Sequence, residues 1–305
     1  MGLLESIVLA VLAASTPLLL AASGELVAER AGVLNLGVEG MMIVGAACGF
    51  AAAWLTGSIV IGALAGIAAG TALAGVFALL TLGLAVNQVA TGLALTILGV
   101  GLSGLIGAGF VGERIAGAPH LYIPGLTDIP FLGRILFGED PFVYLSLAIV
   151  VGIWWFLYRT RAGLELRAIG DNPASAHALG LPVLRKRALA VLFGGACAGL
   201  GGAYLPLAYT PFFTPVMTAG RGWIALALVV FSSWRPGRLV IGAYLFGAVT
   251  ILQLHAQGAG IGIPSQFMSA LPYLATVIVL VLLSRTRRGG STAPATLGTV
   301  FVPDR

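Results

Sequence analysis

The chain has 305 residues, of which 59% are hydrophobic and 9% are charged, and its mean hydropathy is +1.04. A water-soluble globular domain does not need such a composition, whereas a protein with several membrane-spanning helices does. The net charge of +5 does not indicate nucleic-acid binding, because the basic residues cluster beside apolar segments, as they do in cytoplasmic loops.

Apolar runs of about 20 residues, long enough to cross a membrane, follow one another along the chain. They cover 3–22, 37–56, 58–82, 85–108, 142–158, 187–208, 239–256 and 268–284. A further run, 222–234, covers only about 20 Å of a hydrocarbon core of roughly 30 Å. It either extends back through 215–220 or forms a half-helix. The sequence predicts an all-α, polytopic integral membrane protein of about nine transmembrane elements, including broken helices.

The placement of arginine and lysine predicts the orientation. Most of them lie in the loops 159–186 and 235–238, at the start of the run 187–208 and in the tail after 284, whereas the opposite side holds only Arg114, Arg134 and Arg221. The positive-inside rule then places the N-terminus outside and the C-terminus inside. Arg30, in an expected inner loop 23–36, agrees with this orientation.

Residues 1–285 are predicted to form one transmembrane domain, and 286–305 a flexible, non-essential cytoplasmic tail. The longest outer loop, 109–141, contains prolines, aromatic residues and the acidic residues Asp128, Glu139 and Asp140. We expect it to form an ordered external cap or docking surface.

The stretch GDNPASAHALG, 170–180, predicts a short helix on the cytoplasmic side. Asp171 or Asn172 can cap its N-terminus, Pro173 suits the first helical position, and Gly180 can end it. The helix is too short to span a membrane, and its shape suits a groove on a separate soluble partner. We interpret it as a coupling helix. The alternative is a solvated loop with an incidental turn.

Two glycine-interrupted segments lie in opposite halves of the chain, GVLNLGVEGMM at 32–42 and TAGRGWIALA at 218–227. Such pairs point to a transport path in repeat-built transporters. The alternative is that the glycines only let helices pack closely. These segments, and the polar start of the run 85–108, give the candidates for a path or gate: Asn35, Glu39, Asn87, Gln88, Arg221 and Trp223.

Several chemistries are not supported. Lys186 is the only lysine and follows Arg185, so the chain has no GxxxxGK[ST] phosphate loop, and ATP hydrolysis is expected elsewhere. No HExxH or CxxC motif supports a metal site, and we expect no cofactor and no catalytic residue. Ser103, in GLSG, and His255 leave a remote alternative, an intramembrane serine protease.

Four segments resemble the permease subunits of bacterial ABC importers in the branched-chain amino-acid and simple-sugar permease family. They are ERAGVLNLGVEGMM (29–42), NQVATGLAL (87–95), GRGWIALALV (220–229) and the loop that begins at Gly170. The first looks most like nucleoside-type permeases served by a basic-membrane-protein lipoprotein. In such proteins the loop tends to read G-x-N-x-x-A-A-x-x-x-G. This chain supplies Gly170, Asn172, Ala176 and Gly180, and has Ser175 in place of the first alanine of the pair.

The resemblance, which covers roughly residues 5–285, implies a transport subunit rather than an enzyme, in the bacterial cytoplasmic (inner) membrane. Its protein partners would be an ATP-binding subunit, an extracytoplasmic substrate-binding lipoprotein, and either a second related permease or a second copy of this chain. It would also contact the lipid bilayer, and it would bind no nucleic acid. The expected solute is a nucleoside, with a simple sugar as the alternative; a secondary transporter or channel is a further alternative. The coupling residues would be Asp171, Asn172, Pro173, Ala176, His177 and Gly180.

Overall fold

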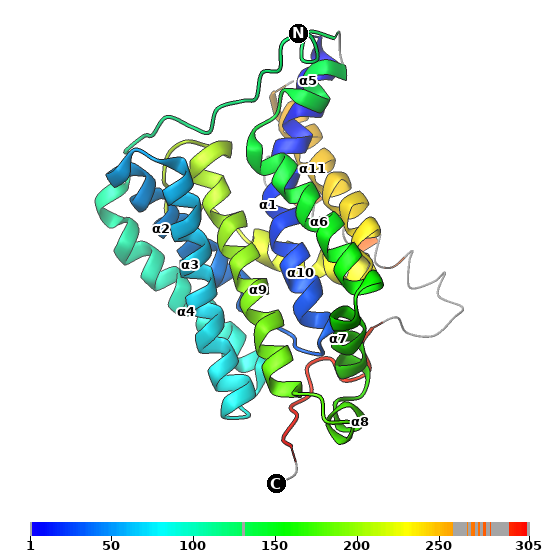
Figure 1. Ribbon diagram of the computed structural model, residues 1–305. Coiled ribbons are helices and arrows are strands. Elements are labelled where there is room, and N and C mark those ends of the chain that lie inside the picture. The colour runs from blue at the N-terminus through cyan, green and yellow to red at the C-terminus, as the bar shows by residue number, and fades with distance from the viewer. Residues whose placement is uncertain are drawn as a thin grey trace.

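The computed structural model describes residues 2–129, 132–258 and 293–303, and single positions between 267 and 281. Within these residues, seven helices are long and apolar enough to cross a membrane by length and composition (Figure 1). They are α1 (Leu3–Arg30), α2 (Val38–Thr56), α3 (Ile59–Ala78), α4 (Gln88–Gly107), α6 (Pro141–Arg159), α9 (Val183–Tyr204) and α11 (Pro236–Gly258). The prediction of an all-α polytopic protein is confirmed, while most of the ninth expected run, 268–284, lies outside the described residues.

Four shorter α-helices have both ends within the described residues, besides two π-helical segments, Leu79–Gly83 and Leu205–Tyr209, and one 3-10 turn, Ala108–Phe110. The four α-helices are α5 (Leu132–Phe137), α7 (Arg161–Asp171), α8 (Pro173–Ala178) and α10 (Arg221–Phe231). The helix α10 lies at mid-height in the bundle and is preceded by non-helical residues from Thr210 onward (Figure 1). The short apolar run is therefore a half-helix, the second of the two readings that the sequence allowed.

Glycines set the spacing of the helices. A Cβ added at Gly40 on α2 would lie 2.6 Å from the carbonyl oxygen of Leu95 on α4, and one at Gly99 would lie 2.6 Å from the Cα of Gly40. Such approaches are too short for any side chain, so the two backbones touch directly. Part of the high glycine content thus serves close packing, as one of the two sequence readings expected.

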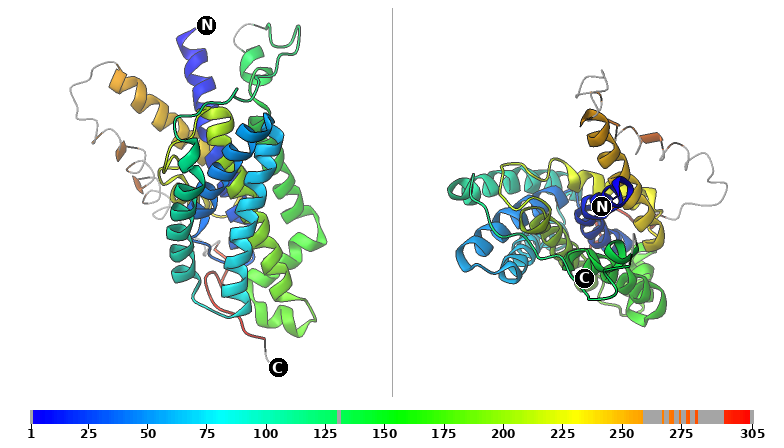
Figure 2. Two further views of the ribbon diagram at one scale, coloured as in Figure 1. Left: turned by 90° about the vertical axis from the view of Figure 1, so that its left-hand side faces the viewer. Right: turned by 90° about the horizontal axis from the view of Figure 1, so that it is seen from above.

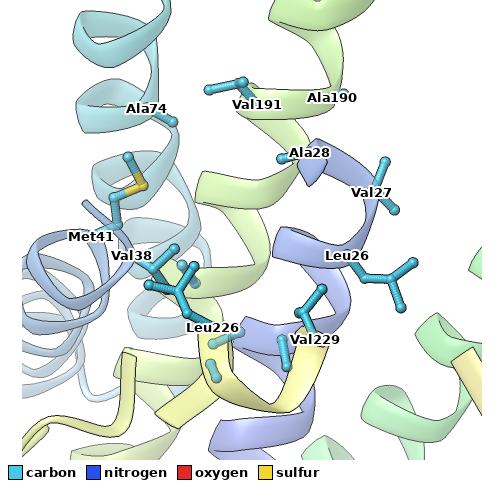
Figure 3. Close-up of a cluster of buried hydrophobic side chains, with 14 of the residues drawn as sticks. Leu26, Val27, Ala28, Val38, Met41, Ala74, Ala190, Val191, Leu226 and Val229 are labelled. Atoms are coloured by element: carbon cyan, nitrogen blue, oxygen red, sulfur yellow. The ribbon is translucent and has the colours of Figure 1, made fainter. Parts of the chain in front are cut away.

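The largest cluster of buried apolar side chains lies where α1, α2, α9 and α10 meet. Figure 3 shows Leu26, Val38, Val191 and Val229 there, one from each of these four helices. Because α10 is buried on this side, its position depends on side chains from both halves of the chain.

The bundle has two different ends. One end holds α7, α8 and residues 293–303, and we call it the basic end. The opposite end holds the N-terminus and α5, and we call it the far end (Figures 1 and 2). Arginine and lysine side chains gather around the basic end, on the last turn of α1, on α7 and on the first turn of α9: Arg30, Arg161, Arg167, Arg185, Lys186 and Arg187. The charge asymmetry expected from the sequence is therefore present in the folded chain.

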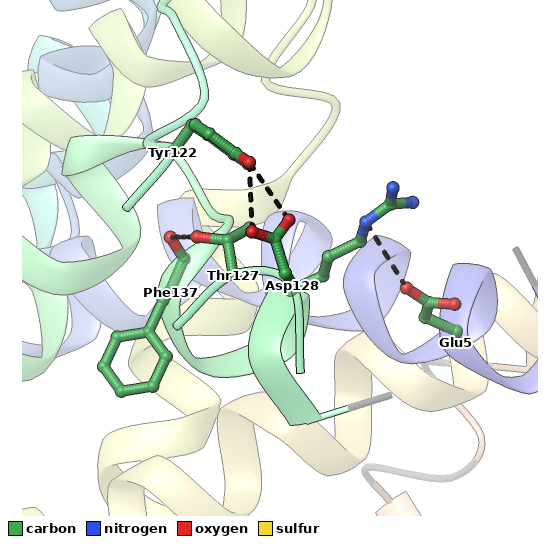
Figure 4. Close-up of polar contacts among 6 residues, drawn as sticks. Glu5, Tyr122, Thr127, Asp128 and Phe137 are labelled. Atoms are coloured by element: carbon green, nitrogen blue, oxygen red, sulfur yellow. Dashed lines mark hydrogen bonds and ion pairs between the residues drawn. The ribbon is translucent and has the colours of Figure 1, made fainter. Parts of the chain in front are cut away.

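The long loop at the far end is held by its own polar contacts (Figure 4). Tyr122 donates to Asp128 Oδ1 at 3.0 Å, and Thr127 Oγ1 donates to the carbonyl oxygen of Phe137 at 3.4 Å. Arg134 Nε lies 3.9 Å from Glu5 Oε1 at the start of α1. These contacts are what an ordered cap would need.

One segment differs from the sequence expectation. The expected inner loop 23–36 is helical as far as Arg30, because its apolar residues Leu26, Val27 and Ala28 continue the buried face of α1. This segment is short and contains polar residues, so composition alone suggested a loop. Of the tail, the structure describes residues 293–303, where Leu297 packs against the main apolar cluster and the Thr296 hydroxyl donates to the carbonyl oxygen of Gly170.

Candidate functional site

Glu39, in the first turn of α2, joins α2 to α10. Its carboxylate accepts hydrogen bonds from Thr218 Oγ1 at 2.6 Å, from the amide of Gly220 at 3.0 Å and from the amide of Gly222 at 2.6 Å. The first amides of a helix lack intrahelical partners and carry partial positive charge, so a carboxylate is stabilised there. We call Glu39, Thr218, Gly220 and Gly222 the glutamate junction.

The glycines of the junction are required by its geometry. Gly220 has a φ of +80°, in the left-handed region that favours glycine. A Cβ at Gly222 would lie 2.5 Å from the backbone nitrogen of Glu39. Val216 and Ala219 also have positive φ values, 57° and 46°, which costs a residue with a side chain about 1–2 kcal/mol. The segment before α10 is thus strained, a feature often found where a protein moves or binds.

Two further candidates surround the start of α10. Arg221 Nη1 donates to the carbonyl oxygens of Met217 and Thr218 at 3.0 and 3.2 Å, and its guanidinium group lies 6.0 Å from the ring centroid of Tyr209. Trp223 is 36% exposed, whereas Glu39 is 5% exposed. The structure therefore brings Glu39, Arg221 and Trp223 together, with the carboxylate buried and the two larger side chains nearer the surface.

Asn35 and Gln88 occupy a second place, around the loop 31–37 before α2. The backbone amide of Leu34 donates to Gln88 Oε1 at 2.9 Å, and the amide of Asn35 donates to Glu25 Oε1 at 3.0 Å. The side chain of Asn35 accepts from the amide of Gly37 at 2.9 Å. These buried polar groups hold an irregular backbone inside the bundle, where unpaired groups would be costly.

Asn87 has a different place from its neighbour Gln88. Its side chain is exposed and accepts a hydrogen bond from the amide of Ala90 at 3.0 Å, which caps the N-terminus of α4. Thus three of the six path candidates lie around the glutamate junction, two lie around the loop 31–37, and the sixth, Asn87, lies at the surface.

Sequence reasoning missed the buried carboxylates of α1. Glu25 and Glu29 are each 1% exposed, and Glu29 accepts a hydrogen bond from Trp234 Nε1. Arg30 donates to the carbonyl oxygen of Trp234 at 2.8 and 3.1 Å, so α1 fixes the chain after α10. The sequence held one indication of this arrangement. Glu25 and Glu29 are four residues apart, so they lie on one face if the first helix continues past residue 22.

The short helix expected in the stretch 170–180 is present at the basic end, as α8. Asn172 Oδ1 accepts from the amide of Ser175 at 2.9 Å, Pro173 is the first residue of α8, and Gly180 has a φ of +81°. Asn172 is the capping residue, and Asp171 is the last residue of α7. The local signals in the sequence therefore gave the correct helix, although α7 itself was not expected.

The two sides of α8 differ. Pro173 and Ala176 are buried, and Ala176 packs with Ile169 and Val183. His177 is exposed and lies edge-on to Phe301, with 5.9 Å between ring centroids. Leu179, which sequence reasoning did not single out, is 83% exposed. A large apolar side chain held out beside a rigid helix is a suitable anchor for another protein.

The serine and histidine of the protease alternative are far apart. Ser103 Oγ donates to the carbonyl oxygen of Val100 at 3.0 Å, and His255 Nδ1 lies 3.0 Å from that of Ile251. Their helices, α4 and α11, lie on opposite sides of the bundle (Figure 2). This alternative is therefore wrong, because a serine nucleophile needs its base within hydrogen-bonding reach.

Residues 7–284 match the family described as "Branched-chain amino acid transport system / permease component". This chain belongs to that family. It is 45% identical over 289 residues, 88% of each chain, to a protein of Haloferax volcanii provisionally named a glucose ABC transporter permease. It is 31% identical to a nucleoside ABC transporter permease of Lactococcus lactis subsp. cremoris, over 99% of this chain and 98% of that one. It is 32% identical to a guanosine ABC transporter permease of Bacillus subtilis, over 91% of this chain and 92% of that one.

The protein is thus a permease subunit of an ABC importer and a multi-pass protein of the cytoplasmic membrane. It is a transport component rather than an enzyme, and the family implies an ATP-binding subunit and a substrate-binding protein as partners. The resemblance to ABC importer permeases is confirmed. The family membership does not support the alternative of a secondary transporter or channel.

Proposed function

We propose that the permease imports a nucleoside and that α8 receives the force from the ATP-binding subunit. The single observation that carries the coupling assignment is Leu179, 83% exposed beside a short, capped helix at the basic end. The basic end faces the cytoplasm in this proposal, because arginine and lysine gather on the cytoplasmic side of membrane proteins. Asp171, Asn172, His177 and Leu179 then face the partner, and Pro173 and Ala176 face the permease.

The solute passes near the start of α10 in this proposal. Trp223 offers an aromatic face on which a nucleobase can stack, and Arg221 offers hydrogen-bond donors beside it. The relatives named for nucleoside and guanosine transport support this solute, and they match over nearly the whole chain. Glu39 acts here as the group that holds α10, because its oxygens already accept three hydrogen bonds.

A simple sugar is the second candidate, because the relative named for glucose is 45% identical. Aromatic side chains also pack against sugar rings, so Trp223 does not separate the two solutes. The substrate-binding protein is proposed to be a lipoprotein that docks on the loops at the far end. A second related permease, or a second copy of this chain, completes the membrane part, and the chain itself needs no cofactor.

Co-purification followed by solute competition tests the proposal. The permease, tagged and extracted from its own membranes in mild detergent, should bring with it an ATP-binding subunit with a phosphate loop. The binding protein of the same system should then bind nucleosides, and unlabelled nucleoside should compete for uptake where glucose does not. A permease that is purified without any ATPase would contradict the coupling assignment, and competition by glucose alone would select the sugar.

A further inference from the structure

Residues 293–303, which we call the strap, lie across the basic end and contact five parts of the bundle (Figure 1). The side chain of Arg187 on α9, which is fully buried, lies at the centre of these contacts. Its Nε donates to the carbonyl oxygen of Ala31 at 2.9 Å, and its Nη2 donates to Thr296 Oγ1 at 3.1 Å. One guanidinium group therefore ties the end of α1 to the strap.

Thr296 also connects the strap to the segment before α8. Its hydroxyl donates to the carbonyl oxygen of Gly170 at 2.7 Å, and its amide donates to the same oxygen at 3.1 Å. Two residues later, the amide of Gly298 donates to the carbonyl oxygen of Gly32 at 3.2 Å. The strap thus runs between the end of α7 and the loop 31–37, joined to both by hydrogen bonds.

The remaining contacts reach α4 and α8. Gln88 Nε2 donates to the carbonyl oxygen of Thr299 at 3.4 Å, while its Oε1 accepts from Leu34. Phe301 packs with Ala176 of α8 and lies edge-on to His177. The same short segment therefore touches both the proposed coupling helix and the polar groups that hold the loop before α2.

We infer that the strap is a positioning element that makes α8, the loop 31–37 and the start of α4 move together. The inference rests on the proposed function, in which the ATP-binding subunit pushes on α8. A push on α8 reaches Gln88 through Phe301 and Thr299, and reaches Gly32 through Gly298. The loop 31–37 leads directly into α2 and Glu39, so the strap offers a short path from the ATPase to the glutamate junction.

Thr296 is the position where this inference is most easily tested. Valine has the shape of threonine but no hydroxyl, so Thr296→Val removes the two hydroxyl bonds, to Gly170 and to Arg187, keeps the amide bond to Gly170, and leaves a buried guanidinium N–H unpaired. The loss of two hydrogen bonds should shift the equilibrium toward a detached strap by at least about tenfold. Thr296→Ser keeps the hydroxyl and is the matched control.

The measurement is ATPase activity of the reconstituted importer, with and without substrate-loaded binding protein. We expect Thr296→Val and Phe301→Ala to lower the stimulation by loaded binding protein about tenfold, with co-purification of the ATP-binding subunit unchanged. Thr296→Ser and Val302→Ala should behave as the wild type, since Val302 is 66% exposed. Full stimulation in Thr296→Val and Phe301→Ala would overturn the inference.

A crosslink separates a positioning role from simple stabilisation. In a background with Cys48→Ser and Cys197→Ala, the pair His177→Cys and Phe301→Cys can be joined by a short bifunctional reagent. If the strap and α8 move as one unit, the crosslinked importer should keep its stimulation, and the crosslink should restore stimulation to Thr296→Val. Loss of stimulation on crosslinking would overturn the inference. A wild-type permease that binds no ATPase would instead refute the proposed function.

Discussion

Glu39 on α2 accepts a hydrogen bond of 2.6 Å from the backbone amide of Gly222 on α10, although 183 residues separate the two in the sequence. Both residues lie in glycine-interrupted segments, one in each half of the chain. One carboxylate side chain therefore links the first turn of α2 to the first turn of α10.

Glu39→Gln should destabilise this junction. Glutamine loses the charge that faces the start of α10, and its amide group places N–H donors against backbone donors. Breaking a buried charged contact costs about 3 kcal/mol, so the thermal unfolding temperature in detergent should fall clearly. Glu113→Gln is the control, because Glu113 is exposed. Equal unfolding temperatures in the two variants would show that the junction contributes little.

Gly222→Ala should be more damaging than an ordinary glycine substitution. The added Cβ would lie 2.5 Å from the backbone nitrogen of Glu39, so α10 must move away from α2. Gly101→Ala on α4 is the matched control, because nothing lies within 4 Å of the added atom and alanine favours helices. The yield of monodisperse protein after extraction compares them, and a normal yield of Gly222→Ala would contradict the observed contact.

The sequence predicted the membrane class, most spans and α8, because each depends on local signals. Long apolar runs identify spanning helices, and the asparagine, proline and glycine around α8 act within a few residues. The partner of Glu39 could not be predicted from the sequence, because it is set by how α10 packs against α2. The sequence did single out Glu39, because a carboxylate near the end of an apolar run is costly and needs a partner.

The errors have a common cause. Glu25, Glu29 and Arg187 are charged residues near the ends of apolar runs, where sequence reasoning expects loops. In the structure, Glu29 and Arg187 have hydrogen-bond partners from distant segments of the chain, and Glu25 accepts from the backbone amide of Asn35 in the loop that follows α1. The strap was missed for the same reason, because its partners Gly32, Gln88 and Gly170 are far from it in sequence.

Leu179→Ala should weaken the binding of the ATP-binding subunit. Burying a leucine side chain at an interface is worth about 1.5–3 kcal/mol, so affinity should fall between about tenfold and a hundredfold. Leu132→Ala, 54% exposed on α5 at the far end, is the control. Equilibrium binding of the ATP-binding subunit to immobilised permease measures the effect, and unchanged affinity would remove Leu179 from the interface.

Two substitutions should disable α8 itself. A bulky residue at Gly180 must adopt a φ of +81°, and Ala176→Asp buries a charge against Ile169 and Val183. Both should abolish uptake while the protein remains in the membrane, as shown by immunoblotting of washed membranes. Normal uptake in both variants would contradict the coupling assignment.

The far end should become less stable as pH rises. Burial, with a smaller effect from Asp140, raises the pKa of Glu139 from 4.5 to about 7. The folded state therefore holds this proton more tightly than the unfolded state, so its stabilising effect is complete below pH 4.5 and is lost as pH rises through 7. Unfolding temperature measured across this range should fall in the wild type and fall less in Glu139→Gln. An equal fall in both would assign the pH dependence to other groups.

ATP-driven uptake in proteoliposomes tests the central claim most directly. Vesicles that contain the permease, its membrane partner and the ATP-binding subunit, with loaded binding protein on the outside and ATP inside, should accumulate labelled nucleoside. Replacing Leu179 by aspartate should stop accumulation and leave the permease in the vesicles. Accumulation without ATP, or full accumulation with the aspartate variant, would contradict import driven through α8.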